Sequence, residues 1–315
     1  MAAANNHHRI WRDGQFVNWE DATIHVMSHV VHYGSSVFEG IRCYATPSGP
    51  AIFRVGAHMR RFVDSCKIYR MPLAYSIEDL SKAAVDTVAE SGLPSCYLRP
   101  IALRAGEQMG VLPSDTPLEV FIIPWTWGTY LGPDALKNGA DVCVSSWRRA
   151  APDTFPSLAK AGGNYLNGQL SKMQARVDGY VEGIMLDSFG LVSEGSGENL
   201  FIVRDGKLIT STISSAILNG ITRDSVIQIA RDMGLEVVEQ SVPREMLYIA
   251  DELFFTGTAA EITPIRSVDR IPIADGKPGA LTLEIQREYM GIANGSRPDR
   301  YGWLTHVPAA VTAGI

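Results

Sequence analysis

Cysteine is scarce in this sequence and follows no metal-binding pattern. The four cysteines are scattered, and no two of them form a CxxC pair: Cys43, Cys66, Cys96 and Cys143. Such spacing argues against a disulfide framework and against a zinc site built on paired thiolates. We therefore expect buried free thiols in a reducing cytoplasm, and no metal site.

Long apolar segments and dense basic segments are also missing. No apolar run approaches the roughly 20 residues that a membrane-spanning helix needs, and residues 1–9 lack the apolar core of a signal peptide. The formal net charge is −6, and arginines cluster only as far as the pairs Arg60-Arg61 and Arg148-Arg149. These absences argue against membrane and nucleic-acid partners. We expect a cytoplasmic protein.

No GxGxxG pattern follows a predicted strand, and the chain has neither internal repeats nor low-complexity tracts. The first of these absences argues against a doubly wound Rossmann sheet. What is present is an ordinary globular composition of 315 residues, 46% hydrophobic and 20% charged. A chain of this length favours two domains over one.

Helix and strand patterns alternate along the first half. Ser76 is placed to cap a helix, with Asp79 three residues later, and Gly92 ends that helix. Extended segments are predicted at 97–103, 118–123 and 141–145. Aromatics, glycines and prolines break the pattern in residues 124–133, which indicates a domain connection. The predicted domains are 1–127 (N-terminal α/β domain), 128–137 (interdomain loop) and 138–315 (C-terminal cofactor-binding domain).

The second half combines short strands with a few helices. After Lys160, apolar residues repeat at helical spacing up to Gly179: Leu166, Leu170, Met173 and Val177. Another helix starts at Thr222, with an inner face of Val226, Ile229, Ala230 and Met233. Turn signals at 188–190 and 205–206 predict hairpins. The mixture predicts an α+β or barrel-like second half, and α/β (α+β) as the fold class of the chain.

Two glycine-containing segments carry groups that suit a pyridoxal phosphate (PLP) enzyme. Two glycines lie close after Lys160 in the segment Lys-Ala-Gly-Gly-Asn-Tyr, and Tyr165 comes five residues after the lysine. Glu194 lies in the glycine-spaced segment 193–200. A PLP enzyme needs an amine for a Schiff base, a phenol near the ring oxygen, and a carboxylate for the pyridine nitrogen. Either segment alone is equally compatible with a solvated lysine or an ordinary turn.

Two further turns could hold a phosphate group. Residues 220–224 place a glycine, backbone N–H groups and a hydroxyl at the start of the Thr222 helix, where the helix dipole favours an anion. On local sequence alone, Thr222 could instead be a plain N-cap. Residues 256–261 offer a second turn with hydroxyls and unhindered amides after the strand 252–255. Two such turns, a lysine and a carboxylate are consistent with a phosphate-bearing aldehyde cofactor.

The sequence as a whole resembles the branched-chain amino acid aminotransferases of PLP fold type IV. The resemblance runs from about Ile10 to Leu304 and rests on six motifs in family order: 29–34, 37–44, 159–166, 193–201, 220–223 and 257–263. It implies an α/β N-terminal domain and a C-terminal pseudo-barrel domain, with PLP (pyridoxal 5'-phosphate) as cofactor. It also implies a homodimer or a higher homo-oligomer.

The resemblance assigns roles to the cofactor-binding residues. Lys160 would form the Schiff base and carry the proton, Tyr165 would contact the phenolic oxygen, and Glu194 would pair with the pyridine nitrogen. Arg61 would clamp the phosphate, for which its planar fork is suited. Without the family, Arg60 is as good a candidate. The remaining predicted cofactor contacts are Leu218 on the ring face and Ile221, Thr222 and Thr258 at the phosphate.

The resemblance also predicts a substrate pocket. Arg99 would meet the distal carboxylate of glutamate inside a pocket that stays apolar enough for valine, leucine or isoleucine. The predicted walls are Tyr33, Phe38, Tyr97, Trp127 and Tyr130, with Met109 and Val111 lining the pocket of the neighbouring subunit. The substrate α-carboxylate would be bound at Gly257, Thr258 and Ala259. Core packing is the alternative explanation for each aromatic residue.

The sequence therefore predicts a branched-chain amino acid transaminase. It would transfer amino groups reversibly from L-leucine, L-isoleucine or L-valine to 2-oxoglutarate, with ping-pong kinetics. One alternative is another fold type IV enzyme: a D-amino acid or (R)-amine transaminase, or an aminodeoxychorismate lyase. The other alternative is a non-enzymatic protein that binds a phosphate-bearing ligand.

Overall fold

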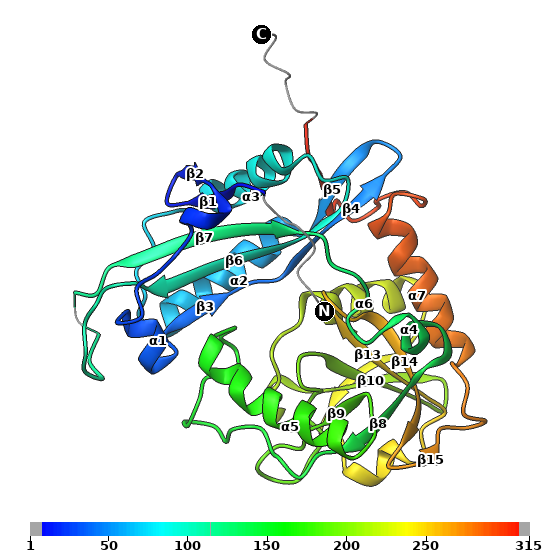
Figure 1. Cartoon of the computed structure of the whole chain (residues 1–315). Coiled ribbons are helices and arrows are strands. Elements are labelled where there is room, and N and C mark those ends of the chain that lie inside the picture. Colours follow the sequence, from blue (N-terminus) through cyan, green and yellow to red (C-terminus); the bar gives the residue numbers. More distant parts are fainter. Residues whose placement is uncertain (1–7, 114, 309–315) are drawn as a thin grey trace. The chain divides into compact units, whose positions relative to one another are not determined.

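A computed structural model describes residues 8–113 and 115–308 of the chain. The described residues separate into two compact units. The first unit takes its residues from 1–127, 159–163 and 291–315, and the second from 128–158 and 164–290. The chain comes back into the first unit at 159–163 and again after 290. The domain limits predicted above do not include these two segments, and those limits stay a prediction. Figure 1 shows the elements of both units.

The first unit is built on an eight-stranded antiparallel sheet. Its order is β16-β5-β4-β6-β7-β1-β2, with β3 paired to β6. The strands are β1 (Ile10–Arg12), β2 (Gln15–Val17), β3 (Ser36–Phe38), β4 (Ile41–Thr46), β5 (Gly49–Phe53), β6 (Cys96–Arg104), β7 (Leu118–Trp125) and β16 (Leu304–His306). The helices are α1 (His29–Tyr33), α2 (Val55–Ile68) and α3 (Ile77–Ser91), with a 3-10 turn at Trp19–Asp21.

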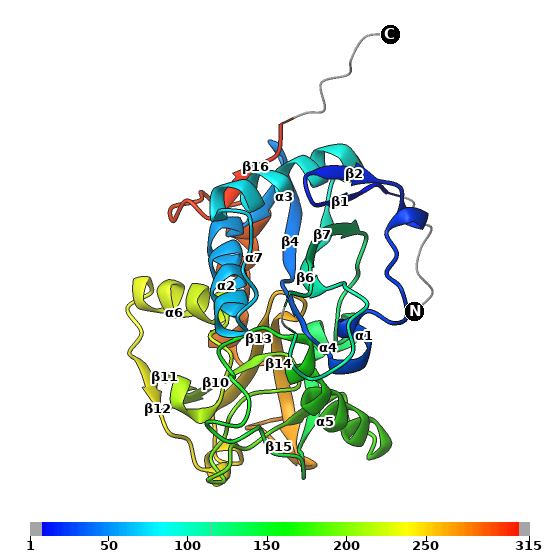
Figure 2. The same cartoon turned by 90° about the vertical axis from the view of Figure 1, so that its left-hand side faces the viewer.

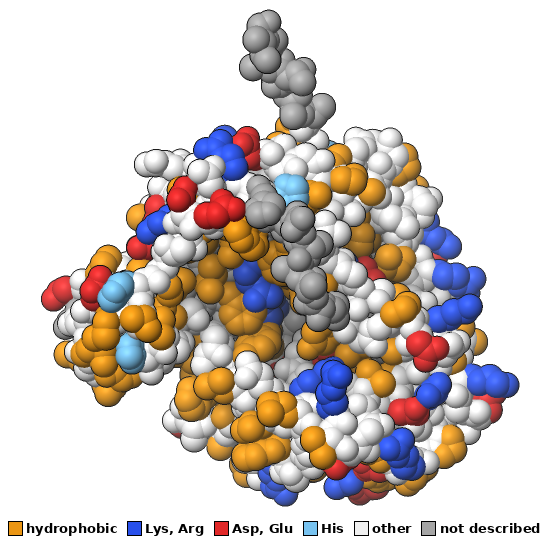
Figure 3. Space-filling view, viewed as in Figure 1, with side chains coloured by type: hydrophobic (Ala, Val, Ile, Leu, Met, Phe, Trp, Pro, Cys, Tyr) orange, Lys and Arg blue, Asp and Glu red, His pale blue; other side chains and the backbone are white. Residues whose placement is uncertain are grey.

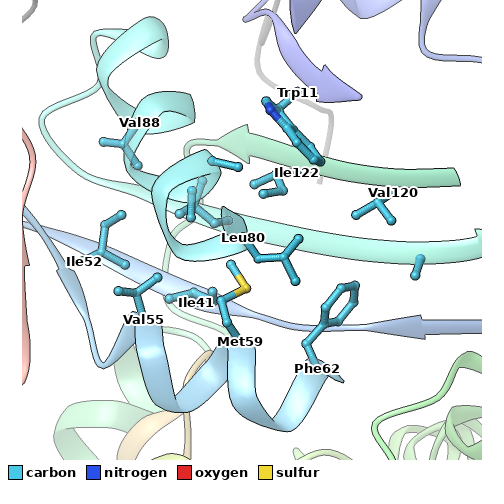
Figure 4. Packing of buried hydrophobic residues seen from close by; sticks show 14 of the residues in the cluster. Trp11, Ile41, Ile52, Val55, Met59, Phe62, Leu80, Val88, Val120 and Ile122 are labelled. Atoms are coloured by element: carbon cyan, nitrogen blue, oxygen red, sulfur yellow. The ribbon is translucent and has the colours of Figure 1, made fainter. Parts of the chain in front are cut away.

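Helices α2 and α3 cover one face of this sheet (Figure 2). Met59 and Phe62 of α2 and Leu80 of α3 pack with Ile41 of β4 and Ile122 of β7, and all five side chains are fully buried (Figure 4). Burying one such side chain stabilises the fold by roughly 1.5–3 kcal/mol. This core therefore fixes α2 on the sheet.

The local signals predicted the limits of α3 correctly. Ser76 accepts a hydrogen bond from the Asp79 backbone N–H, and the Asp79 carboxylate accepts one from the Ser76 backbone N–H, which forms a complete capping box. Gly92 ends the helix at a φ of 64°, a left-handed conformation that glycine adopts without strain. The predicted extended segments at 97–103 and 118–123 lie within β6 and β7, and the third, at 141–145, matches the strand β8 (Ala140–Val144) except for its last residue.

The second unit contains an eight-stranded mixed sheet. Its order is β12-β11-β10-β13-β14-β8-β9, with β15 paired to β14. The strands are β8 (Ala140–Val144), β9 (Glu182–Ile184), β10 (Asn199–Arg204), β11 (Lys207–Ser211), β12 (Val237–Gln240), β13 (Glu252–Gly257), β14 (Glu261–Val268) and β15 (Ile271–Pro272). The helices are α4 (Pro133–Asn138), α5 (Tyr165–Val177), α6 (Ile221–Asp232) and α7 (Ala280–Ala293), which the second unit holds as far as Met290. Short 3-10 turns lie at Gly162–Asn164, Ile213–Ser215 and Arg244–Leu247.

Both predicted hairpins are present in this unit. Arg204 and Lys207 are paired across β10 and β11, and the residues between them, Asp205 and Gly206, have φ values of 50° and 73°. Two positive φ values define the tight hairpin turn that an Asp-Gly pair favours. The turn at 188–190 is enclosed by an antiparallel bridge between Leu186 and Val192.

Helix α5 forms where the apolar spacing predicted it, but it exposes its apolar side. The buried positions of α5 are small: Gly168, Ser171 and Ala175. The large apolar side chains at helical spacing are exposed by 61, 40, 64 and 86%: Leu166, Leu170, Met173 and Val177. Hydrophobic surface is visible over this helix in Figure 3. The apolar pattern therefore marks a surface, and the core side of α5 is the small-residue side.

All four cysteines are buried free thiols, as predicted. Within residues 8–113 and 115–308, no helix is both long and apolar enough to cross a membrane.

Candidate active site

The backbone of Lys160 is fixed from two sides within the first unit. Its carbonyl accepts a hydrogen bond from the Phe38 N–H at 3.0 Å, and its own N–H donates to Oγ of the buried Ser65, also at 3.0 Å. A Cβ on Gly162 would approach the Ser36 Oγ to 2.4 Å, so a larger residue here would force the Ser36 side chain of β3 to move. Gly162, two residues after Lys160, therefore has a packing role beside β3.

The Lys160 amine lies over an aromatic ring. Its Nζ is 5.1 Å from the centre of the Phe38 ring. Burial lowers the pKa of Lys160 from 10.5 to about 8, and the positive charge of Arg61 acts in the same direction. A lysine with this pKa has an appreciable unprotonated fraction near neutral pH, which a nucleophilic amine requires.

Arg99 contacts the same ring. Its Cζ is 4.5 Å from the centre of Phe38, and the rings of Tyr97 and Trp125 lie at 5.9 and 5.6 Å. The Arg99 Nε is buried and has no hydrogen-bond partner among the described residues. A buried donor without an acceptor is costly, and a bound carboxylate would satisfy it.

The predicted substrate residues of the first unit fall into two groups. Trp127 packs edge-on against Tyr97 at 4.5 Å between ring centres, so it joins the group of Lys160, Phe38 and Arg99. Tyr33 does not. Its hydroxyl accepts a hydrogen bond from the Gly110 N–H at 3.0 Å, which places it beside the loop that carries Met109 and Val111. Those two side chains are exposed by 50 and 83%.

The two arginines of α2 have different environments. Arg60 is 68% exposed and pairs with Asp64 on its own helix. Arg61 is 13% exposed and makes a fork-like pair with Glu39, its Nε donating to Oε1 at 2.6 Å and its Nη2 to Oε2 at 2.9 Å. His58 also contacts Glu39, with 2.7 Å between Nδ1 and Oε2.

Glu39 and His58 were missed from the sequence as functional candidates. A signal existed for His58, because residues three apart on a helix share a face and His58 and Arg61 are so spaced. No comparable signal exists for Glu39, because its partners lie about twenty residues away on another element.

In the second unit, Glu194 is the centre of a buried polar network. Its Oε1 pairs with Arg149 Nη2 at 3.0 Å. Its Oε2 accepts hydrogen bonds from Asn199 Nδ2 and from the Leu218 N–H, both at 2.9 Å. Asn199 also donates to the Leu218 carbonyl. This network fixes the carboxylate and brings Glu194 together with Leu218, while Arg149 and Asn199 were not predicted.

Tyr165 and Tyr130 also lie near the segment that follows Glu194. Tyr165 is the first residue of α5, and its ring faces the position where Gly197 lacks a side chain, at 3.9 Å. Tyr130 hydrogen-bonds Ser196, and the Lys172 Nζ lies 5.1 Å from its ring centre. Burial raises the pKa of Tyr130.

The two predicted phosphate turns are both in the second unit. Helix α6 begins at Ile221, one residue before the predicted start, so Thr222 lies in its first turn. The alternative of a threonine N-cap is therefore wrong: Gly220 occupies the N-cap, and it has no side chain with which to cap the helix. The turn at 257–260 joins β13 to β14, and it contains Gly257, Thr258 and Ala259. The dipole of a helix favours an anion at its first turn.

Glu198 lies in a different environment from Glu194. Burial, reinforced by the negative charge of Glu182, raises the pKa of the Glu198 carboxyl to about 8, and its Oε1 has no hydrogen-bond partner among the described residues. Burial therefore favours the neutral form of Glu198. Glu194, paired with Arg149, is the better candidate for a charged partner of a pyridine nitrogen.

A sequence model of one protein family matches this chain. Residues 36–268 match the model described as amino-transferase class IV. The chain belongs to the class IV aminotransferase family.

Similar class IV aminotransferases extend this result over almost the whole chain. A branched-chain-amino-acid aminotransferase of Escherichia coli K12 is 51% identical over 299 residues, which cover 95% of this chain and 97% of the relative. The crystal structure of the Escherichia coli enzyme superposes with a TM-score of 0.93, at 51% identity, and covers 96% of this chain and 100% of that one. The T.th. branched-chain amino acid aminotransferase complexed with N-(5'-phosphopyridoxyl)-L-glutamate has a TM-score of 0.91 at 46% identity, with 96% and 99% covered.

These likenesses confirm two predictions. The chain is an enzyme, an aminotransferase, and its two-sheet α/β architecture is that of PLP fold type IV.

Proposed function

We propose that this aminotransferase exchanges amino groups between branched-chain L-amino acids and 2-oxoglutarate, with pyridoxal 5'-phosphate as its cofactor. The name of the Escherichia coli relative supports the branched-chain substrate. The phosphopyridoxyl-glutamate adduct in the T.th. structure supports the cofactor and the glutamate/2-oxoglutarate pair. Leucine, isoleucine and valine are the proposed amino donors, and the two half-reactions follow a ping-pong order.

One observation carries the proposal: Lys160 and Arg99 share the ring of Phe38. The lysine supplies an amine whose pKa burial has lowered to about 8. The arginine supplies a buried donor that lacks an acceptor among the described residues, surrounded by aromatic rings. An apolar wall with one cation suits both an aliphatic side chain and a carboxylate-bearing one.

The predicted cofactor residues fit the chemistry of pyridoxal phosphate. In the first unit, Lys160 offers the amine and Arg61 a guanidinium for the phosphate. In the second unit, Glu194 is a fixed carboxylate, and the first turn of α6 at Ile221 and Thr222, with glycine at its N-cap, suits an anion. The remaining proposed contacts are Tyr165, Leu218 and Thr258.

Each protein group has a definite task in the proposed reaction. When bound, pyridoxal phosphate supplies the electron sink that stabilises a carbanion at the substrate α-carbon. The Lys160 Nζ takes the α-proton and later returns one. With a pKa of about 8, roughly a tenth of this amine is unprotonated at pH 7. Glu194 supplies fixed negative charge, which works best when its position is set in advance.

Substrate recognition divides between charged and apolar groups. Arg99 holds the distal carboxylate of glutamate, while Phe38, Tyr97, Trp127 and Tyr130 provide aromatic walls for an aliphatic side chain. Gly257, Thr258 and Ala259 bind the α-carboxylate through their turn. Arginine suits the first task because its guanidinium forms two parallel hydrogen bonds with a carboxylate.

We also propose that the chain functions as a homodimer or a higher homo-oligomer. The support is the exposed apolar side of α5, since large exposed apolar patches usually mark interfaces. A second exposed apolar group consists of Tyr33, Met109 and Val111. Because Tyr33 lies beside the other two, we assign all three to the pocket of the neighbouring subunit. The four buried free thiols suit the reducing cytoplasm proposed as the location.

Light scattering after size exclusion tests the oligomer, using two variants that each add one negative charge to α5. Met173→Glu places the charge on the apolar side, and Gln169→Glu places it on an exposed polar position of the same helix. Met173→Glu should lower the measured mass at micromolar concentration, and Gln169→Glu should not. A wild-type protein that runs as a monomer would contradict the proposal.

A chiral assay tests the reaction itself. The purified enzyme with pyridoxal phosphate and 2-oxoglutarate is offered L-leucine, D-alanine and (R)-1-phenylethylamine, and glutamate formation is measured. L-Leucine should be the preferred donor by at least about tenfold in kcat/KM, a difference of about 1.4 kcal/mol. Preference for either of the other donors would instead establish another fold type IV activity. Absence of turnover with all three would refute the transaminase proposal.

A further inference from the structure

Three charged or polar side chains form a buried cluster in the first unit: Glu39, His58 and Arg61. Glu39 and His58 are almost fully buried, at 0 and 1% exposed. The Glu39 carboxylate accepts hydrogen bonds from Arg61 Nε at 2.6 Å and from Arg61 Nη2 at 2.9 Å, and it contacts His58 Nδ1 at 2.7 Å. The Gly40 N–H donates to the same carboxylate at 3.2 Å. Both carboxylate oxygens therefore have partners.

The protonation states within this cluster follow from its surroundings. Burial raises the pKa of the Glu39 carboxyl, but the charge of Arg61 and the hydrogen bonds of Arg61 and His58 outweigh it, so the pKa lies well below its usual value. Burial lowers the pKa of His58. We take His58 as neutral, with the proton on Nδ1, because an ionised carboxylate can only accept.

The pairing determines how Arg61 presents its guanidinium. A guanidinium has five N–H groups in one plane, and Glu39 binds the edge formed by Nε and Nη2. Two parallel hydrogen bonds fix both the plane and the direction of such a group. Holding Arg61 in one orientation before a ligand arrives lowers the conformational cost of binding.

Glu39 is also connected to the backbone that holds Lys160. Glu39 follows Phe38, whose N–H donates to the Lys160 carbonyl, and the Glu39 N–H donates to the Pro100 carbonyl at 2.8 Å. Glu39 is therefore hydrogen-bonded to β6 through its backbone and to α2 through its side chain. It directly follows Phe38, whose ring lies under the Lys160 amine.

We propose that Glu39 is a positioning residue for the cofactor phosphate: it fixes Arg61 in the orientation that binds phosphate, and His58 fixes Glu39. This inference rests on the proposed function, because it takes Arg61 as a phosphate ligand. Glu39 acts through Arg61 and touches no substrate. A buried ion pair that merely stabilises the fold would weaken every ligand alike, whereas a positioning residue should affect only ligands that carry the phosphate.

Pyridoxal and pyridoxal phosphate separate these roles, because they differ only in the phosphate. The cofactor-free full chain is titrated with each compound, and binding is followed by the visible absorbance of the bound form. Removing one charge-assisted contact to a phosphate corresponds to roughly a ten- to hundredfold change in dissociation constant. Glu39→Gln should therefore weaken pyridoxal phosphate by that factor and change pyridoxal by less than about threefold.

Four further variants complete the experiment. Arg61→Gln should show the same selective loss, and Glu39→Gln with Arg61→Gln should lose little more than Arg61→Gln alone, since residues acting as a unit are not additive. Arg60→Gln, which removes the exposed arginine beside it, should leave both dissociation constants unchanged. His58→Ala should show a smaller loss with the same selectivity, and it replaces Glu39→Gln as the decisive variant if Glu39→Gln does not fold.

The outcomes distinguish this inference from the proposed function. Equal weakening of both compounds by the decisive variant would overturn the positioning role and leave the cofactor assignment intact. Full additivity of Glu39→Gln and Arg61→Gln would overturn it in the same way. A wild-type chain that binds neither compound would overturn the proposed function and this inference together.

Discussion

Replacing Arg99 by alanine should separate the two substrates that the proposed enzyme accepts. The guanidinium lies over Phe38, Tyr97 and Trp125, and its buried Nε has no acceptor among the described residues. If the acceptor is the distal carboxylate of glutamate, Arg99→Ala removes the only partner proposed for that group. Leucine carries no distal charge, so it loses no such partner.

The size of the effect follows from the kind of contact. A hydrogen bond that involves a charged group contributes roughly 1.5–3 kcal/mol, so kcat/KM for glutamate should fall by about one to two powers of ten. The aromatic contacts of Arg99 are worth roughly 0.5–2 kcal/mol in total, and they act on the free enzyme rather than on either substrate. We expect a change of less than about fivefold for leucine.

The assay must follow the half-reactions separately, because steady-state turnover combines them. The enzyme loaded with pyridoxal phosphate is mixed with glutamate or with leucine in a stopped-flow instrument. The change in cofactor absorbance is recorded as a function of substrate concentration. Arg42→Ala is a matched control, since the Arg42 guanidinium also lies near the Tyr97 ring, at 6.0 Å. That control should alter both half-reactions to a similar, small extent.

Equal losses for glutamate and leucine in Arg99→Ala would refute the reasoning. Arg99 would then support the pocket or bind the α-carboxylate that both substrates share, and dual specificity would need another explanation.

Three other variants make separate predictions. Glu194→Gln should keep its shape but lose its charge, and single-turnover rates with leucine should fall by roughly 10²–10³; unchanged rates would transfer its role to another acid. Gly220→Ala should lower the free energy of unfolding by roughly 1–3 kcal/mol in a urea titration. The new Cβ would lie 1.9 Å from Asn199 Oδ1 and displace the residue that donates to Glu194. Unchanged stability would show that Asn199 can move without cost. In the cofactor-free protein, Lys160 has a pKa of about 8 when folded and 10.5 ordinarily, so the folded chain binds fewer protons between these values and its stability should rise with pH across that window. Lys160→Met should remove this rise and be more stable than wild type at pH 7 by on the order of 1–3 kcal/mol, with equal pH profiles as the contradicting result.

Local signals were sufficient for most of the secondary structure. The Ser76 cap, the Gly92 end of α3 and the Asp205-Gly206 turn each depend on neighbours within a few residues, so the sequence contains the whole cause. The start of α6 was missed by one residue because Gly220, which lacks a capping side chain, serves as its N-cap.

Contacts between distant segments could not be read from the sequence. Nothing near Glu39 indicates that it pairs with Arg61, and nothing near Glu194 indicates Arg149. The placement of Tyr33 beside Gly110 likewise depends on how α1 packs.

Periodicity also misled at one element, because it does not say which side of a helix faces the core. Met173 and its neighbours at helical spacing on α5 have the spacing of a buried face, yet the buried face of this helix consists of Gly168, Ser171 and Ala175.

The most direct test of the central claim is to identify the lysine that bonds to pyridoxal phosphate. The enzyme is incubated with the cofactor and reduced with borohydride, which makes the bond permanent, and the digested protein is analysed by mass spectrometry. We expect the cofactor mass on the peptide that contains Lys160, and its loss in a folded Lys160→Ala variant. Labelling of a different lysine, or an unlabelled wild-type protein, would contradict it.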